Sequence, residues 1–201
     1  MEIIKKSGLL VSLLLLVSCS VFSPIKTQPE ARYELKSIPP VAVAKRAHAS
    51  TLMVMNPETN PPFNTTQMAY TNQPYQISYF AKSRWAATPA EMLQTVIVQT
   101  LQNTHYFHAV IQPPSNSQYS YALSTQVITL IQDFSSNPSR VRLTLEAQLT
   151  RTGTGRIIAS KRFSIVEPSP QNSPYGGVIA ANRASARMLN ELTEFCRRSI
   201  R

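Results

Sequence analysis

The feature that most constrains the fold is a strict alternation of apolar and polar residues over positions 140–149. Its apolar members are Val141, Leu143, Leu145, Ala147 and Leu149, and the residues between them are arginine, threonine, glutamate and glutamine. Because successive side chains of a strand point to opposite faces, the pattern predicts a strand with one buried face and one solvated face. A sheet of this kind needs a second layer to cover its apolar face.

Strands are also predicted on both sides of this stretch. Residues 119–134 form one, with a change of phase near Val127, and residues 157–166 form the other after a Thr-Gly-Thr-Gly turn at 152–155. Consecutive strands joined by short turns favour antiparallel pairing. Shorter strands are predicted at 33–35, 51–55 and 107–111, a hairpin with arms 67–71 and 75–80, and irregular segments at 37–50 and 56–66.

Two amphipathic helices complete the expected elements. The first begins at Thr88-Pro89-Ala90-Glu91, a capping box in which the threonine hydroxyl accepts from the Glu91 amide and the glutamate accepts from the Thr88 amide. It ends near Asn103, and the second helix runs from about 178 to 198. The expected fold class is therefore α+β, an antiparallel sheet with two amphipathic helices packed on one face.

The first nineteen residues predict export. Lys5 and Lys6 precede an apolar stretch over 9–17, which is shorter than the roughly 20 residues that a membrane-spanning helix needs. The stretch ends in Leu-Val-Ser-Cys at 16–19, the pattern of a bacterial lipoprotein signal. The alternative is an ordinary signal peptide or a membrane anchor in which Cys19 occurs by chance.

In the lipoprotein interpretation, cleavage precedes Cys19, which then carries acyl chains such as palmitate. Each buried methylene contributes about 0.8 kcal/mol, and several chains hold a protein firmly to a bilayer. Ser20 follows the cysteine where aspartate does not, which by resemblance to the enterobacterial sorting rule favours the periplasmic face of the outer membrane. The predicted organisation is a signal peptide at 1–18, a lipidated tether at 19–31 and one domain at 32–201.

The chain has one cysteine besides Cys19, so no internal disulfide is expected despite the oxidising compartment. Cys196 shares helical spacing with Met188, Leu192 and other apolar residues. We therefore expect it to be a buried core residue, with a reactive thiol or an intermolecular bridge as the alternative.

Net charge narrows the choice of partner. The full chain carries +10, and +9 remains once Glu2, Lys5 and Lys6 of segment 1–18 are removed. Export makes nucleic acid an unsuitable partner for this charge, so none is predicted. The sequence leaves open an anionic phospholipid surface, an acidic protein surface and solubility alone.

Few residues suit catalysis or metal binding. His105 and His108 would point to opposite faces of a strand, and no carboxylate or thiol completes a ligand set. Asp133, the single aspartate, is expected at a turn or a strand edge. Trp85 is expected to anchor the first helix on the sheet, with a ligand platform as the alternative. No catalytic residue, cofactor or metal is therefore predicted.

Over about residues 32–200 the chain resembles the ABC-type transport auxiliary lipoprotein family. The segments that carry the resemblance are an aromatic strand before Arg84-Trp85-Ala86, the capped helix with Met92-Leu93 and Leu101, the strand Phe107-His108-Ala109-Val110, and the later strands and last helix in the family's order. Segment 37–50, which is alanine-rich and basic, departs from the family pattern.

The resemblance implies an accessory role without catalysis in the movement of phospholipid or other hydrophobic molecules between two membranes. The implied partners are a mammalian-cell-entry-type periplasmic transport protein, the outer membrane through the anchor, and further copies of the chain in a ring. Only Cys19, the acyl attachment point, maps to a functional position. Two alternative functions stay open: a periplasmic lipid carrier and an assembly subunit of a lipopolysaccharide export complex.

The lipid anchor generates a direct prediction. Cys19→Ala removes the thiol that would be acylated, so we expect the chain to leave the outer-membrane fraction and its amino terminus to carry no acyl chains. Cys196→Ala is the matched control and should remain membrane-bound. Cell fractionation with mass spectrometry of the mature chain checks both, and a bare amino terminus on the parent protein would contradict the lipoprotein interpretation.

Overall fold

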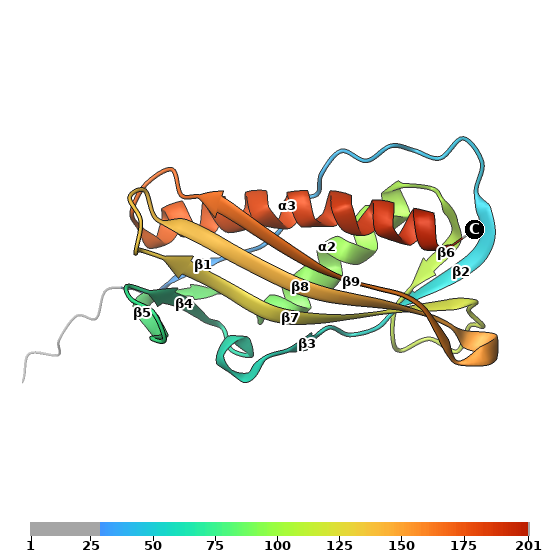
Figure 1. Cartoon of the computed structure of the whole chain (residues 1–201), viewed down its shortest axis with the longest axis horizontal. Helices are drawn as coiled ribbons and strands as arrows, with labels where there is room; N and C mark the ends of the chain where they lie inside the picture. Colours follow the sequence, from blue (N-terminus) through green and yellow to red (C-terminus); the bar gives the residue numbers. More distant parts are fainter. Residues whose placement is uncertain (1–28, 201) are drawn as a thin grey trace, which may run out of the picture.

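A computed structural model describes residues 29–200, in which a nine-stranded mixed sheet curls around two helices (Figure 1). Three long strands dominate it: β7 (Tyr121–Asp133), β8 (Arg140–Arg151) and β9 (Arg156–Pro168). They form an antiparallel meander, as predicted. The β8–β9 turn contains a 3-10 segment, η3 (Thr152–Thr154), and ends at Gly155, whose φ of 64° suits glycine.

The change of phase predicted near Val127 is present. The register of β7 against β8 shifts between Val127 and Thr129, so one residue of β7 is extra. Buried positions fall on odd numbers up to Val127, and Leu130 then continues the same core. This β-bulge keeps the apolar residues of a long strand on one face while the strand bends around the helices.

The second edge of β7 is divided among three short strands. β2 (His48–Val54) pairs with its beginning, β3 (Glu58–Thr59) with its middle and β4 (Gln67–Thr71) with its end, all in parallel. The three long strands are antiparallel as predicted, whereas these short attachments are parallel, so the whole sheet is mixed. Parallel neighbours need a long crossover, and the chain supplies it by passing through a helix before it reaches β7.

The remaining strands extend these branches. β6 (Phe107–Ile111) pairs in parallel with β2, and β1 (Ala31–Tyr33) pairs in parallel with β5. β5 (Ser78–Trp85) forms a hairpin with β4 as predicted, but it begins three residues later and ends five residues later than expected. β1 lies two residues earlier than predicted because β5 fixes its position. Residues 34–47 hold no helix or strand, as predicted for most of this segment, whereas the expected loop at 56–66 contains β3 and a 3-10 turn, η2 (Pro61–Phe63).

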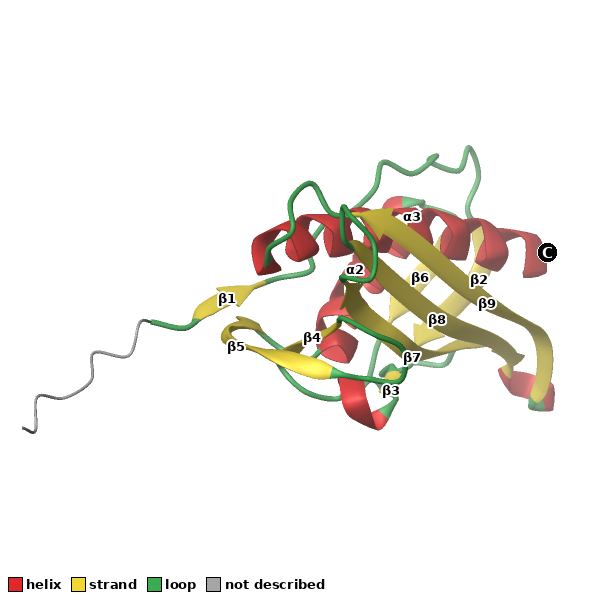
Figure 2. Ribbon diagram, turned by 60° about the vertical axis from the view of Figure 1, so that its left-hand side comes forward, coloured by secondary structure: helices red, strands yellow, loops and turns green. Residues whose placement is uncertain are grey.

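Both helices cover one face of the sheet, which confirms the α+β class (Figure 2). α2 (Pro89–Asn103) has the predicted bounds, and its capping box is formed: Glu91 N donates to Thr88 Oγ1 at 3.4 Å, and Thr88 N donates to Glu91 Oε2 at 2.9 Å. The hydrogen bonds to Thr88 also lower the pKa of Glu91. α3 (Pro174–Ser199) begins four residues earlier than predicted, at a Ser173 cap.

The core lies between the helices and the concave face of the sheet. Its fully buried large side chains include Phe163, Leu143, Leu145, Leu149, Leu93, Ile97, Met188 and Leu189. A second, smaller apolar cluster of Phe63, Ala69 and Ile131 is separate from this core. Ile131 follows Leu130 of the main core, so this cluster lies on the opposite face of β7.

The early start of α3 depends on a close contact with β7. A Cβ on Gly177 would lie 2.1 Å from Gln132 Oε1, so only glycine lets the helix approach so closely. Gln132 is buried, and its Nε2 donates to Ser139 Oγ at 3.0 Å and to Ser173 O at 3.1 Å. This side chain therefore joins the end of β7 to the start of β8 and to the cap of α3.

Gly177→Ala should destabilise the fold although alanine is the better helix former. The methyl group would displace the Gln132 side chain, and a buried polar group left without partners costs about 1–3 kcal/mol. Gly153→Ala is the matched control, since no atom lies within 4 Å of its added Cβ. Chemical denaturation would measure both, and an equal or higher stability of Gly177→Ala would contradict this account of the contact.

Candidate functional site

The described chain begins at one end of the molecule, and α3 holds that end in place. Asn182 Oδ1 accepts from the amides of Lys36 and Ser37 at 3.0 and 3.1 Å, and its Nδ2 donates to Glu34 O at 2.9 Å. Three hydrogen bonds therefore fix the segment after β1 on the helix. Cys19 lies outside the described residues, so its modification stays a prediction.

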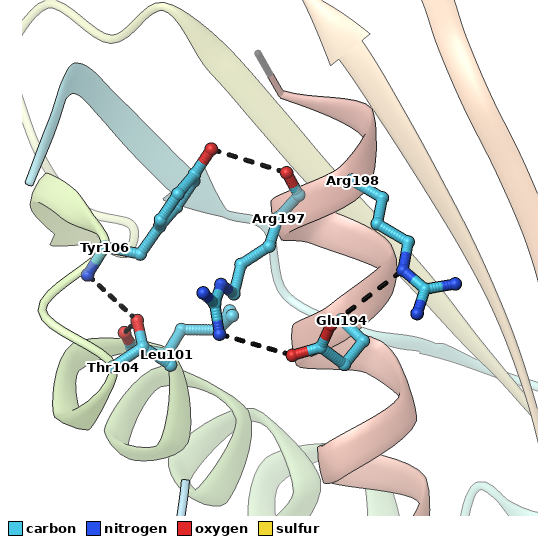
Figure 3. Close-up of polar contacts among 6 residues, drawn as sticks. All are labelled: Leu101, Thr104, Tyr106, Glu194, Arg197 and Arg198. Atoms are coloured by element: carbon cyan, nitrogen blue, oxygen red, sulfur yellow. Dashed lines mark hydrogen bonds and ion pairs between the residues drawn. The ribbon is translucent and has the colours of Figure 1, made fainter. Parts of the chain in front are cut away.

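The opposite end of α3 is tied down by Tyr106, which follows α2 (Figure 3). Its hydroxyl donates to Ile200 O at 2.6 Å and lies 3.3 Å from Arg197 O, and the Arg197 guanidinium lies 5.5 Å from its ring centre. Its amide donates to Thr104 Oγ1 at 3.1 Å. The two hydroxyl contacts satisfy carbonyl groups at the end of α3 that would otherwise lack partners.

A groove opens beside this end, between α3 and β9. It is lined by Lys161, Asn190, Glu191, Glu194, Phe195, Arg198 and Ser199, and we call it the α3–β9 groove. Glu194 accepts from Arg197 at 3.3 Å and lies 3.9 Å from Arg198 (Figure 3). Lys161 lies 3.6 Å from Glu191. Phe195 is half-buried in this groove and is surrounded by acidic and basic side chains. This arrangement suits a protein partner, because protein–protein interfaces combine aromatic anchors with a polar rim.

The two histidines considered as metal ligands do not lie in one site. His105 lies in the turn after α2 with a φ of 48°, and His108 is exposed on β6. Within residues 29–200, no three histidine, cysteine, aspartate or glutamate side chains form a cluster. The described part of the domain thus offers no metal centre built from these side chains.

Asp133 ends β7, as predicted for a residue at a turn or an edge. Its carboxylate accepts from the Ser135 amide at 2.9 Å and lies 3.4 Å from Arg142 Nη2. Burial raises the pKa of Asp133, but the hydrogen bonds from Ser135 and the charges of Arg142 and Arg140 outweigh it, so the pKa is lowered overall. An ionised carboxylate held by a turn and two arginines has a structural role.

Trp85 and Cys196 are both core residues. Trp85 is 4% exposed and packs in the main core, as the anchor interpretation predicts. Cys196 is fully buried on α3, and burial raises the pKa of its thiol to about 12. A buried, protonated thiol favours the core interpretation over the reactive-thiol alternative.

Sequence reasoning missed the two side chains that hold the ends of α3. Tyr106 and Asn182 each act through backbone groups far away in the chain, and neither belongs to a motif. A polar Asn182 on the otherwise apolar side of a predicted helix is a weak signal, and Tyr106 offers none.

None of the helices in residues 29–200 is long and apolar enough to span a membrane.

Solved structures of other proteins resemble this fold. Protein XCC0632 of Xanthomonas campestris is 17% identical, with a TM-score of 0.76 over 86% of this chain and 96% of that one. A second structure, described only as an uncharacterized protein, is 14% identical, with a TM-score of 0.68 over 84% of this chain and 99% of that one. A third is the PelC dodecamer of Paraburkholderia phytofirmans, at 15% identity and a TM-score of 0.46 over 76% and 92%.

The sequence matches the model of the ABC-type transport auxiliary lipoprotein component over residues 33–193. This chain therefore belongs to the ABC-type transport auxiliary lipoprotein family, as its motifs predicted, and that family is one of transport components rather than enzymes. No curated protein matches the sequence. The likenesses to solved structures concern the fold alone.

The burial of Cys196 predicts its reactivity. We expect no alkylation of the native mature protein by iodoacetamide at pH 8, and one alkylated thiol per chain in urea. The pKa of this thiol is about 12 in the folded state. In the unfolded chain it is about 8.5. Stability should therefore fall as the pH rises above the unfolded value. Mass spectrometry checks the alkylation, and rapid labelling of native Cys196 would contradict its burial.

Proposed function

We propose that this chain is a periplasmic accessory lipoprotein, anchored in the outer membrane through Cys19, that acts as a docking scaffold for an intermembrane transport system. The single observation that carries the proposal is the family match over residues 33–193, and the lipoprotein signal predicted for residues 1–19 supports it. The transported molecules would be phospholipids or other hydrophobic compounds. The domain's own contribution would be binding and not catalysis.

The arrangement of the domain supports a scaffold. The chain enters beside β1, whereas the α3–β9 groove lies at the carboxyl end of α3, which Figure 1 places at the opposite side of the molecule. A protein anchored at the first end would present the second to the periplasm. We propose this groove as the surface that meets a mammalian-cell-entry-type transport protein, with further copies of the chain as additional partners.

A lipid carrier is the second candidate, and the core argues against it. A carrier needs an enclosed apolar cavity of a few hundred Å³. The space between helices and sheet is instead filled by leucine, isoleucine, valine and phenylalanine side chains of the main core. Native mass spectrometry of the purified protein would separate the two candidates, since a carrier should retain a bound lipid.

Partner capture tests the scaffold. Mild crosslinking of the acylated protein in its host membranes, followed by purification from detergent, should recover a mammalian-cell-entry-type protein. Arg198→Glu reverses a charge on the rim of the groove, so we expect it to lower that recovery severalfold. Arg140→Glu is the matched control, because Arg140 begins β8 far from the groove and is also exposed.

Each other outcome has a defined meaning. Recovery of an outer-membrane barrel of lipopolysaccharide export in place of the transport protein would favour the assembly-subunit alternative. Recovery of neither partner would contradict the scaffold. Equal recovery by Arg198→Glu and Arg140→Glu would leave the scaffold standing and exclude the groove as its docking surface.

A further inference from the structure

A second groove lies at the end where the described chain begins. It runs between β1 with the residues that follow it and the first turns of α3, and we call it the β1–α3 groove. Its apolar floor includes Tyr33 and Tyr175, whose ring centres are 5.9 Å apart, together with Val178. Tyr175 remains 52% exposed, although it is a large aromatic residue. Figure 2 shows β1 and the start of α3 at the same end of the molecule.

The rim of the groove carries surplus positive charge. Arg32 and Arg84 share one carboxylate, Glu30, which lies 3.8 Å from Arg32 and accepts a hydrogen bond from Arg84. Lys36 lies 3.8 Å from Glu34, and this exposed pair is neutral overall.

Arg183 adds a further positive charge to the rim. It is exposed on α3 and has no acidic group within ion-pair distance among residues 29–200. Arg32 and Arg84 carry one positive charge more than Glu30 balances, so with Arg183 this end of the molecule has two uncompensated positive charges beside the groove.

The anchor fixes what this rim can face. Ten peptide units separate Cys19 from Pro29, and a chain of this length spans at most about 35 Å. An acylated Cys19 therefore keeps the β1–α3 groove close to the headgroups of its own leaflet. The groove and the lipid surface would meet at high local concentration, since the tether makes their contact intramolecular.

We propose that the β1–α3 groove binds the anionic phospholipid headgroups of the leaflet that holds Cys19. Arg32, Lys36 and Arg183 donate hydrogen bonds to headgroup phosphates, and the tyrosine rings lie at the boundary between headgroups and acyl chains, where amphipathic aromatic rings are favoured. The contact orients the domain so that the α3–β9 groove faces away from the membrane. This inference rests on the acyl anchor of the proposed function.

Two lysines of the same chain allow an internally controlled test. Lys36 is on the rim, whereas Lys45 follows Ala44, whose amide donates to Thr104 O at the carboxyl end of α2, away from β1. Both lysines are exposed. The acylated full-length mature protein is inserted into vesicles of phosphatidylethanolamine with phosphatidylglycerol, or with phosphatidylcholine in its place, and the acetylation rate of each lysine is measured by mass spectrometry.

The expected result is selective protection. In vesicles with phosphatidylglycerol, acetylation of Lys36 should slow about fivefold or more relative to Lys45, since each basic residue near an anionic surface contributes roughly a fivefold preference. In vesicles with phosphatidylcholine the two rates should be similar. The variant Arg32→Gln/Arg183→Gln should lose the protection of Lys36, and the equally charged control Arg46→Gln/Arg156→Gln should keep it.

Failure of the anchor and failure of the groove are distinguishable. A protein that does not float with either kind of vesicle contradicts the acyl anchor itself. A protein that floats with unprotected Lys36, or with equal protection on both lipid mixtures, overturns the headgroup contact. Protection that disappears as the protein is diluted in lipid also overturns it, because a second copy of the chain then covers the groove.

Discussion

The burial of one apolar face of β7, β8 and β9 beneath α3 is the interaction on which the remaining structure depends. Leu143, Leu145 and Leu149 of β8 are fully buried, and Met188 and Leu189 of α3 meet the same core. Apolar area removed from water contributes about 25 cal/mol per Å², so this layer is a main source of stability. The opposite face of β8 carries arginine, threonine and glutamate and remains accessible to water.

β7 is the strand that organises the topology around this layer. Its first edge is fully paired with β8, so every other branch of the sheet must attach to its second edge. The branch that contains β6 attaches near Leu123, and the branch that contains β1 attaches near Asp133. The two ends of β7 therefore lie beside different branches of the sheet. The Gln132–Gly177 contact then places the start of α3 beside the second branch.

Local patterns predicted most of the elements because the relevant interactions are local. Alternation located β8, and the capping box at Thr88 gave the start of α2. The parallel attachments to β7 were missed, since strand direction depends on pairings between segments far apart in the chain. The Tyr106 and Asn182 contacts were missed for the same reason, and the first turn of α3 was missed because the Gly177–Gln132 contact also joins distant segments.

The free side of β9 bears on how copies of this chain meet at high concentration. Within residues 29–200, β9 pairs with β8 alone, so its other side offers unpaired backbone groups along thirteen residues. Two copies joined through this side in antiparallel fashion would form a closed pair, because each copy contributes its one free β9 edge. Charged side chains on an edge strand discourage such pairing, and β9 carries Lys161 and Arg162, so this edge disfavours the fusion of neighbouring sheets.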